Sequence, residues 1–200
     1  MSNGGGHTER KRTATVNRCT KETEIALTLS LDGGETAVET GIGFFDHMLA
    51  ALALHGGLGL RLQVQGDLAV DGHHTVEDTG LVLGQALRQA LGGGAGIERF
   101  GQARVPMDEA LAAAALDISG RPYLYCRIPE TQARIGAYDA CLTEEFWRAV
   151  CAAAGLTLHI EAYGGNAHHI AEAVFKACAR ALRQAVRPTG GGVPSTKGCL

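Results

Sequence analysis

The sequence lacks the features that mark several large classes of protein. Charged residues make up 20% of the chain, with a formal net charge of -3 and no block or stripe of basic residues, so nucleic acid is not an expected partner. No run approaches the roughly 18 apolar residues of a membrane-spanning helix. Residues 1–11 are Gly-rich and then basic, without the apolar core of a signal peptide. We therefore expect a cytoplasmic globular protein, not bound to a membrane, with a flexible N-terminal tail at 1–11.

The cysteines form no recognisable metal or redox motif. None of the six belongs to a C-x-x-C pair. Without an export signal they are expected to be reduced thiols, because disulfides form mainly in oxidising compartments. Their spacing also differs from that of zinc ligands.

The sequence does contain a short pattern that occurs twice. Residues 73–77 read H-H-T-V-E and residues 168–172 read H-H-I-A-E, an offset of 95 residues. The same offset relates A-L-R-Q-A-L at 86–91 to A-L-R-Q-A-V at 181–186. Two matches at one offset indicate an internal duplication. We therefore expect one domain made of two repeat halves, residues 12–95 and 96–188. A flexible C-terminal tail at 189–200 follows, and its glycines at 190–192 would let it close over a bound substrate.

Hydrophobic periodicity predicts an α+β fold with a similar order of elements in both halves. In the first half we expect a strand within 12–31, a turn at 32–34 with a hairpin partner at 35–40, a helix at 44–54, a strand at 58–64 and a helix at 74–91. In the second half we expect strands at 104–107, 113–118, 123–128 and 155–161, and helices at 143–154 and 168–186. Gly80 and Gly84 share a side of their helix, which would let a second helix approach closely.

Helix geometry divides each H-H-x-x-E copy between two sites. Residues i and i+4 share a face, whereas residue i+1 is turned by about 100°. His73 and Glu77 can therefore converge on one ion, while His74 points elsewhere. In the second copy, His168 and Glu172 can likewise converge, while His169 points elsewhere. An offset of 98 places His47 opposite Glu145, which adds one candidate from each half. The candidate ligands are His47, His73, His74, Glu77, Glu145, His168, His169 and Glu172.

This donor set is large enough for two metal ions. Imidazole and carboxylate without thiolate fit manganese, iron or zinc better than calcium. A His-His pair by itself is more often a surface or capping feature than a metal site. Here, however, five of the eight histidines lie at the repeated positions or at His47, each beside a carboxylate, which favours the metal interpretation.

Taken in order, the motifs resemble the imidazoleglycerol-phosphate dehydratase family, the manganese lyases of histidine biosynthesis. The matching stretches are spread over nearly the whole chain. They are T-K-E-T at 20–23, G-I-G-F-F-D-H-M-L at 41–49, H-G at 55–56, G-D at 66–67, H-H-T-V-E-D at 73–78, R-F-G at 99–101, P-M-D-E-A at 106–110, D-I-S-G-R-P at 117–122, N-A-H-H at 166–169, F-K at 175–176 and P-S-T-K-G at 194–198.

The resemblance implies a fold and an assembly that periodicity does not give. Each half would be a four-stranded sheet with helices on one face, and the helices of both halves would pack between the two sheets. The chain would form a homo-oligomer of 24 subunits. Each active site would lie at a subunit interface and hold two Mn²⁺ ions.

The resemblance also implies a reaction, the dehydration of D-erythro-imidazole-glycerol phosphate to imidazole acetol phosphate. The implied catalytic carboxylates are Glu22, Glu77 and Glu172. The implied substrate-binding residues are Glu22, His55, Arg99, Arg121, Lys176, Ser195 and Lys197. Arginine and lysine suit phosphate, the first as a planar fork of donors and the second as a point charge. From the residues alone, without the family resemblance, we would interpret Glu22 as an ordinary surface charge.

The sequence departs from the family pattern at two positions. Glu145 stands where members often have His, and Ala51 where they often have a polar Gln. A carboxylate can replace imidazole on manganese, so the first change alters the charge of the site. Two other functions remain open from the residues alone, a dinuclear-metal phosphohydrolase and a non-enzymatic metal-binding protein.

Overall fold

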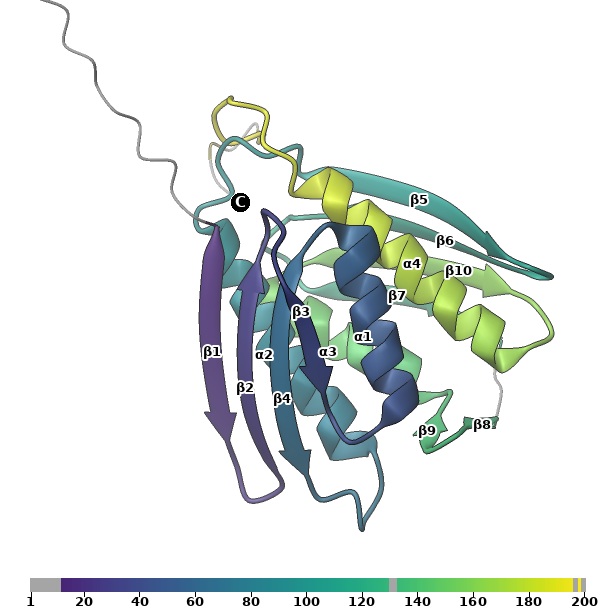
Figure 1. The fold of residues 1–200 in the computed structure, drawn as a ribbon. Helices are drawn as coiled ribbons and strands as arrows, with labels where there is room; N and C mark the ends of the chain where they lie inside the picture. Colours follow the sequence, from purple (N-terminus) through teal and green to yellow (C-terminus); the bar gives the residue numbers. More distant parts are fainter. Residues whose placement is uncertain (1–11, 130–132, 196–197, 199–200) are drawn as a thin grey trace, which may run out of the picture.

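The computed structural model describes residues 12–129, 133–195 and 198, and it contains two four-stranded sheets of the same topology (Figure 1). The first sheet has the order β1-β2-β4-β3, and the second has the order β5-β6-β10-β7. In each sheet the first three strands in this order are antiparallel, and the last pairs in parallel with its neighbour. The two halves of the chain thus build equivalent sheets, as the duplicated sequence predicts.

The first sheet corrects the expected strand at 12–31 and its expected hairpin. The region forms two antiparallel strands, β1 (Thr13–Cys19) and β2 (Thr23–Ser30), joined by a turn that contains Glu22. Strand β3 (Thr36–Glu39) does not pair with β2 but runs parallel to β4 (Gly59–Gly66). Parallel strands need a crossover, and here helix α1 (Gly43–Gly56) provides it. The chain does turn near residues 32–34, but the strand that follows, β3, lies on the opposite side of β4 from β2.

The second sheet follows the expected pattern, and the second half of the chain also forms a separate small hairpin. Its strands are β5 (Phe100–Met107), β6 (Ala110–Asp117), β7 (Tyr123–Arg127) and β10 (Thr157–Tyr163). The short strands β8 (Arg134–Ile135) and β9 (Tyr138–Asp139) pair with each other and were not predicted. Tyr138 is fully buried and packs on Phe44 and Phe45, so this hairpin contributes to the core.

Four helices form a layer between the two sheets (Figure 1). They are α1, α2 (His73–Leu91), α3 (Leu142–Ala154) and α4 (Ala167–Ala185). Helix α1 packs on α4 and α2 packs on α3. A Cβ on Gly80 would lie 2.7 Å from the carbonyl oxygen of Phe146, which confirms that this glycine allows a second helix to approach. No helix in the described ranges is both long and apolar enough to span a bilayer.

The paired helices run in the same direction, which places their N-terminal ends together. His47 and Glu172 meet near the start of α1 and α4, and Gly56 lies beside Ala179 further along both helices. Likewise, Gly72 lies beside Leu142 at the start of α2 and α3, and Gly84 beside Val150. All candidate metal ligands therefore come from one end of the helix layer.

Candidate metal centre

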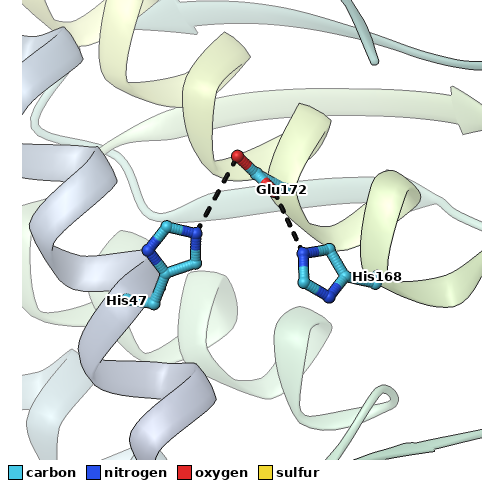
Figure 2. A group of neighbouring side chains, drawn as sticks. All are labelled: His47, His168 and Glu172. Atoms are coloured by element: carbon cyan, nitrogen blue, oxygen red, sulfur yellow. Dashed lines mark hydrogen bonds and ion pairs between the residues drawn. The ribbon is translucent and has the colours of Figure 1, made fainter. Parts of the chain in front are cut away.

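Three candidate ligands converge between α1 and α4 (Figure 2). Nε2 of His47 lies 3.9 Å from Oε1 of Glu172, and Nε2 of His168 lies 3.2 Å from its Oε2. One donor atom from each of the three side chains lies within 4.8 Å of the others. Within the described parts of the chain, no other set of three such donors comes this close together. Two imidazoles and a carboxylate form a donor set that fits a divalent transition ion.

Glu172 is nearly buried and is held by a cation as well as by the histidines. Its Oε1 lies 2.7 Å from Nζ of Lys176, one helical turn away. Burial alone would raise the pKa of Glu172, but the hydrogen bond and charge of Lys176, together with His47 and His168, outweigh it and lower the pKa. The carboxylate is thus kept in its charged form, the form that binds metal.

The first H-H-x-x-E copy forms a smaller group. Nε2 of His73 lies 3.7 Å from Oε2 of Glu77 across one turn of α2, and both side chains are about half exposed. Glu145, the counterpart of His47, instead lies 3.6 Å from Nε of Arg148 on its own helix. His47 and Glu145 are predicted to be equivalent, but in this chain His47 lies near another candidate ligand and Glu145 lies near an arginine.

The two histidines of each pair contact different groups, as helix geometry predicts. The rings of His73 and His74 have an interplanar angle of 90°, and those of His168 and His169 an angle of 84°. His74 Nδ1 lies 3.0 Å from Oδ2 of Asp67. The hydrogen bond to this carboxylate raises the pKa of His74.

A carboxylate also holds the second histidine of the other pair. His169 Nδ1 lies 2.7 Å from Oε2 of Glu109. This hydrogen bond raises the pKa of His169 and is the main reason that the pKa of Glu109 falls to about 2. Asp67 and Glu109 were not among the predicted site residues. Both lie within the motif stretches, but nothing in the sequence indicates which side chain would contact them.

The turn between β1 and β2 brings Glu22 to the same end of the molecule. Its Oε1 lies 3.8 Å from Nε2 of His74, and its side chain is 54% exposed. A carboxylate that is accessible and close to a metal-ligand candidate can exchange a proton with a bound molecule.

Of the predicted phosphate-binding residues, Arg99, Arg121 and Ser195 lie at the opposite end of the helix layer. The backbone N–H of Arg99 donates to the carbonyl of Ala185, the last residue of α4. The Arg99 guanidinium binds Asp117 at 2.7 Å and the carbonyl of Pro194, also at 2.7 Å, and Arg121 lies 3.7 Å from Asp117. Ser195 follows Pro194 in the same segment, whereas Lys197 lies outside the described residues. His168 to Ala185 spans roughly 25 Å at the rise of an α-helix.

His55 lies between these two ends, on the last turn of α1. Burial lowers the pKa of His55, and the nearby cations Lys176 and Arg180 lower it further. Its predicted role in substrate binding remains a prediction.

Comparison with known proteins gives a single family. The family model for imidazoleglycerol-phosphate dehydratase matches residues 40–182. A protein of that name from Gluconobacter oxydans is 56% identical over 194 residues, covering 94% of this chain and 98% of the relative. The crystal structure of the Staphylococcus aureus enzyme has a TM-score of 0.79 at 39% identity, covering 88% of this chain and 99% of that one. A structure of the Pyrococcus furiosus enzyme, in complex with (S)-C348, has a TM-score of 0.81 at 38% identity, covering 92% and 100%.

Proposed function

The chain belongs to the imidazoleglycerol-phosphate dehydratase family of hydro-lyases, and we propose that it catalyses the manganese-dependent dehydration of D-erythro-imidazole-glycerol phosphate in histidine biosynthesis. The observation that carries this proposal is the convergence of His47, His168 and Glu172 at the interface of α1 and α4. These residues would hold one ion, and His73 with Glu77 would contribute to a second. When bound, manganese would supply Lewis acidity that stabilises negative charge on the imidazole ring of the substrate.

The surroundings of the carboxylates favour Glu22 as the group that takes the carbon-bound proton. Both oxygens of Glu172 are engaged, Oε1 with Lys176 and Oε2 with His168. Glu22 is more exposed, and its Oε1 lies 3.8 Å from Nε2 of His74. In the reaction one carbon gives its proton to this carboxylate, and the hydroxyl of the neighbouring carbon takes up a proton from solvent and leaves as water. The resulting enol tautomerises to the ketone, and Glu22 returns its proton to solvent.

The separation of the two ends of the helix layer supports active sites that are shared between subunits. The substrate has three carbons between its imidazole ring and its phosphate, so it cannot span the roughly 25 Å length of α4. If Arg99 and Arg121 bind phosphate and His168 binds metal, these residues must come from different copies of the chain. We therefore propose a homo-oligomer, of 24 subunits as the family resemblance implies, with each site at an interface.

The test is an assay of the manganese-loaded protein with imidazole-glycerol phosphate, following ketone and inorganic phosphate together. The proposal expects ketone without phosphate release, loss of turnover on chelation and recovery when Mn²⁺ is added back. Phosphate release without ketone would instead identify a phosphohydrolase, and metal binding without turnover a non-enzymatic protein.

A matched pair of variants assigns the proton transfer. Glu22→Gln removes the base and should lower kcat by about 10²- to 10⁴-fold. Glu161→Gln makes the same chemical change on the exposed face of β10 and should leave kcat near that of the wild type. Equal kcat values for the two variants would show that Glu22 is not the base.

A further inference from the structure

Glu22 and Glu109 occupy equivalent positions in the two halves but contact opposite nitrogens of their histidines. Each is the residue directly before the second strand of its sheet, β2 or β6. Glu109 contacts Nδ1 of His169 at 2.7 Å, whereas Glu22 approaches Nε2 of His74 at 3.8 Å. The carboxylate of this duplicated turn therefore approaches a different nitrogen of the histidine ring in each half.

In the first half another carboxylate takes the Nδ1 position. Asp67, directly after β4, contacts Nδ1 of His74 at 3.0 Å. The residue directly after β10 is Gly164, where a Cβ would lie 2.7 Å from Cβ of Ala110. No side chain fits there without a shift, so in the second half the turn residue Glu109 is the group that contacts Nδ1 of the histidine, while the exposed Asp108 approaches Nε2 of the same ring at 3.7 Å.

We propose that Asp67 and Glu109 are positioning residues that hold His74 and His169 with the hydrogen on Nδ1 and the lone pair on Nε2, and that Asp67 thereby leaves Glu22 free for proton transfer. An imidazole that donates from one nitrogen to a carboxylate presents the other as a metal ligand in a fixed orientation. This inference rests on the proposed function, because it takes Nε2 of both rings to be metal-binding.

A purely structural role for Glu109 is the alternative to be tested. Its Oε1 accepts the backbone N–H of Asn166 at 2.8 Å and that of Gly165 at 3.3 Å, so it also supports the loop before α4. Glu109→Gln separates the two roles. Its amide oxygen can still accept from the backbone, but its NH₂ group then faces Nδ1 and donates, which favours the tautomer with hydrogen on Nε2.

The tautomers can be read directly in the metal-free protein. Magic-angle-spinning NMR of protein with ¹⁵N-labelled imidazole rings, at about pH 8.5 where histidine is normally neutral, distinguishes protonated from bare nitrogens whatever the particle size. The resonances of each ring are assigned from their absence in His74→Gln and His169→Gln. The wild type should show hydrogen on Nδ1 of both rings. Glu109→Gln should move it to Nε2 in His169 alone, and Asp67→Asn in His74 alone, whereas Glu22→Gln should move neither.

Affinity for Mn²⁺ alone, followed by the electron paramagnetic resonance of the free ion, is the second measurement. Glu109→Gln and Asp67→Asn should each weaken binding about 10- to 100-fold, while Glu161→Gln should not. A change of tautomer without a change in affinity would overturn the inference, as would hydrogen on Nε2 in the wild type. If the wild type shows the expected tautomers but binds no Mn²⁺, the proposed function fails at its metal site, and the inference that rests on it is overturned as well.

Discussion

At the scale of single residues, the surroundings of His55 make the stability of the protein depend on pH. Burial, followed by Lys176 and Arg180, lowers the pKa of His55 below its ordinary value of 6.5, despite the opposing charge of Glu172. The unfolded chain therefore binds the proton more readily than the folded chain. The stability contributed by neutral His55 is complete above about pH 6.5 and is lost as the pH falls through the lowered pKa.

We expect His55→Gln to remove this part of the pH dependence. In urea unfolding at about pH 7.5 and 5.5, the stability difference between wild type and His55→Gln should shrink at the lower pH. Histidines with raised pKa values cancel in this difference, because both proteins contain them. Leu54→Gln, a change at the exposed neighbouring residue, should keep the wild-type pH dependence. A difference for His55→Gln that stays constant between the two pH values would contradict the assignment.

Local geometry could be predicted at this scale and remote contacts could not. The spacing of His168 and Glu172, and the separate direction of His169, follow from the helical repeat and are seen in the structure. Lys176 on Glu172 also has i,i+4 spacing, a contact that the sequence did not lead us to expect, since the family resemblance implies a role for Lys176 in phosphate binding. Glu109 contacts His169 only because the turn between β5 and β6 meets the first turn of α4, 60 residues away in the chain, a contact that no local pattern specifies.

At the scale of helices and strands, close packing of α2 on α3 depends on two glycines. A Cβ on Gly84 would lie 2.6 Å from the carbonyl oxygen of Val150 and 2.7 Å from Cβ of Ala153. We expect Gly84→Ala to destabilise the protein by about 1–3 kcal/mol in urea unfolding, because the helices must move apart. The higher helix propensity of alanine offsets up to about 1 kcal/mol of this loss.

Gly93→Ala is the matched control for this prediction. Gly93 lies in the turn after α2, and a Cβ there would meet nothing within 4 Å. The free energy of unfolding of Gly93→Ala should remain within about 1 kcal/mol of that of the wild type. If Gly84→Ala and Gly93→Ala have equal stability, then α2 and α3 can accommodate a Cβ at Gly84, and the close contact does not depend on this glycine.

Helices and strands could be predicted where a local sequence pattern specifies them. Periodicity located all four helices of the described residues, and Gly80 predicted a close helix contact that the structure confirms. The pairing of β3 with β4 was not predicted, because it depends on a crossover through α1. The hairpin of β8 and β9 has only two residues in each strand, too few to give a periodic signal.

At the scale of the whole molecule, the two ends of the helix layer carry different chemistry. The candidate metal ligands lie at the N-terminal ends of the helices, whereas Arg99 and Arg121 lie near the C-terminal end of α4. The sequence could reveal the duplication that builds this layer. It could not show which surfaces of two copies meet, because that depends on complementarity between folded chains.

Mixing two inactive variants tests whether the ends of different subunits form one site. His168→Ala removes a ligand at one end, and Arg121→Ala removes a cation at the other, where it is exposed and so tolerates truncation. Each variant alone should have little activity. When they are co-expressed in equal amounts, about a quarter of the shared sites should contain both intact residues, if subunits assemble at random. Activity of the mixed particles, assayed per subunit, should rise accordingly.

The control pairs His168→Ala with Glu172→Ala, two changes at the same end of α4. Nε2 of His168 and Oε2 of Glu172 are 3.2 Å apart in one chain, so every site in these mixtures lacks one of the two donors. No activity should return. If the His168→Ala and Arg121→Ala mixture also stays inactive while its subunits still assemble together, the substrate site of Arg121 does not include the metal ligands of another copy. Full activity and unchanged substrate affinity of Arg121→Ala alone would show instead that Arg121 does not bind substrate.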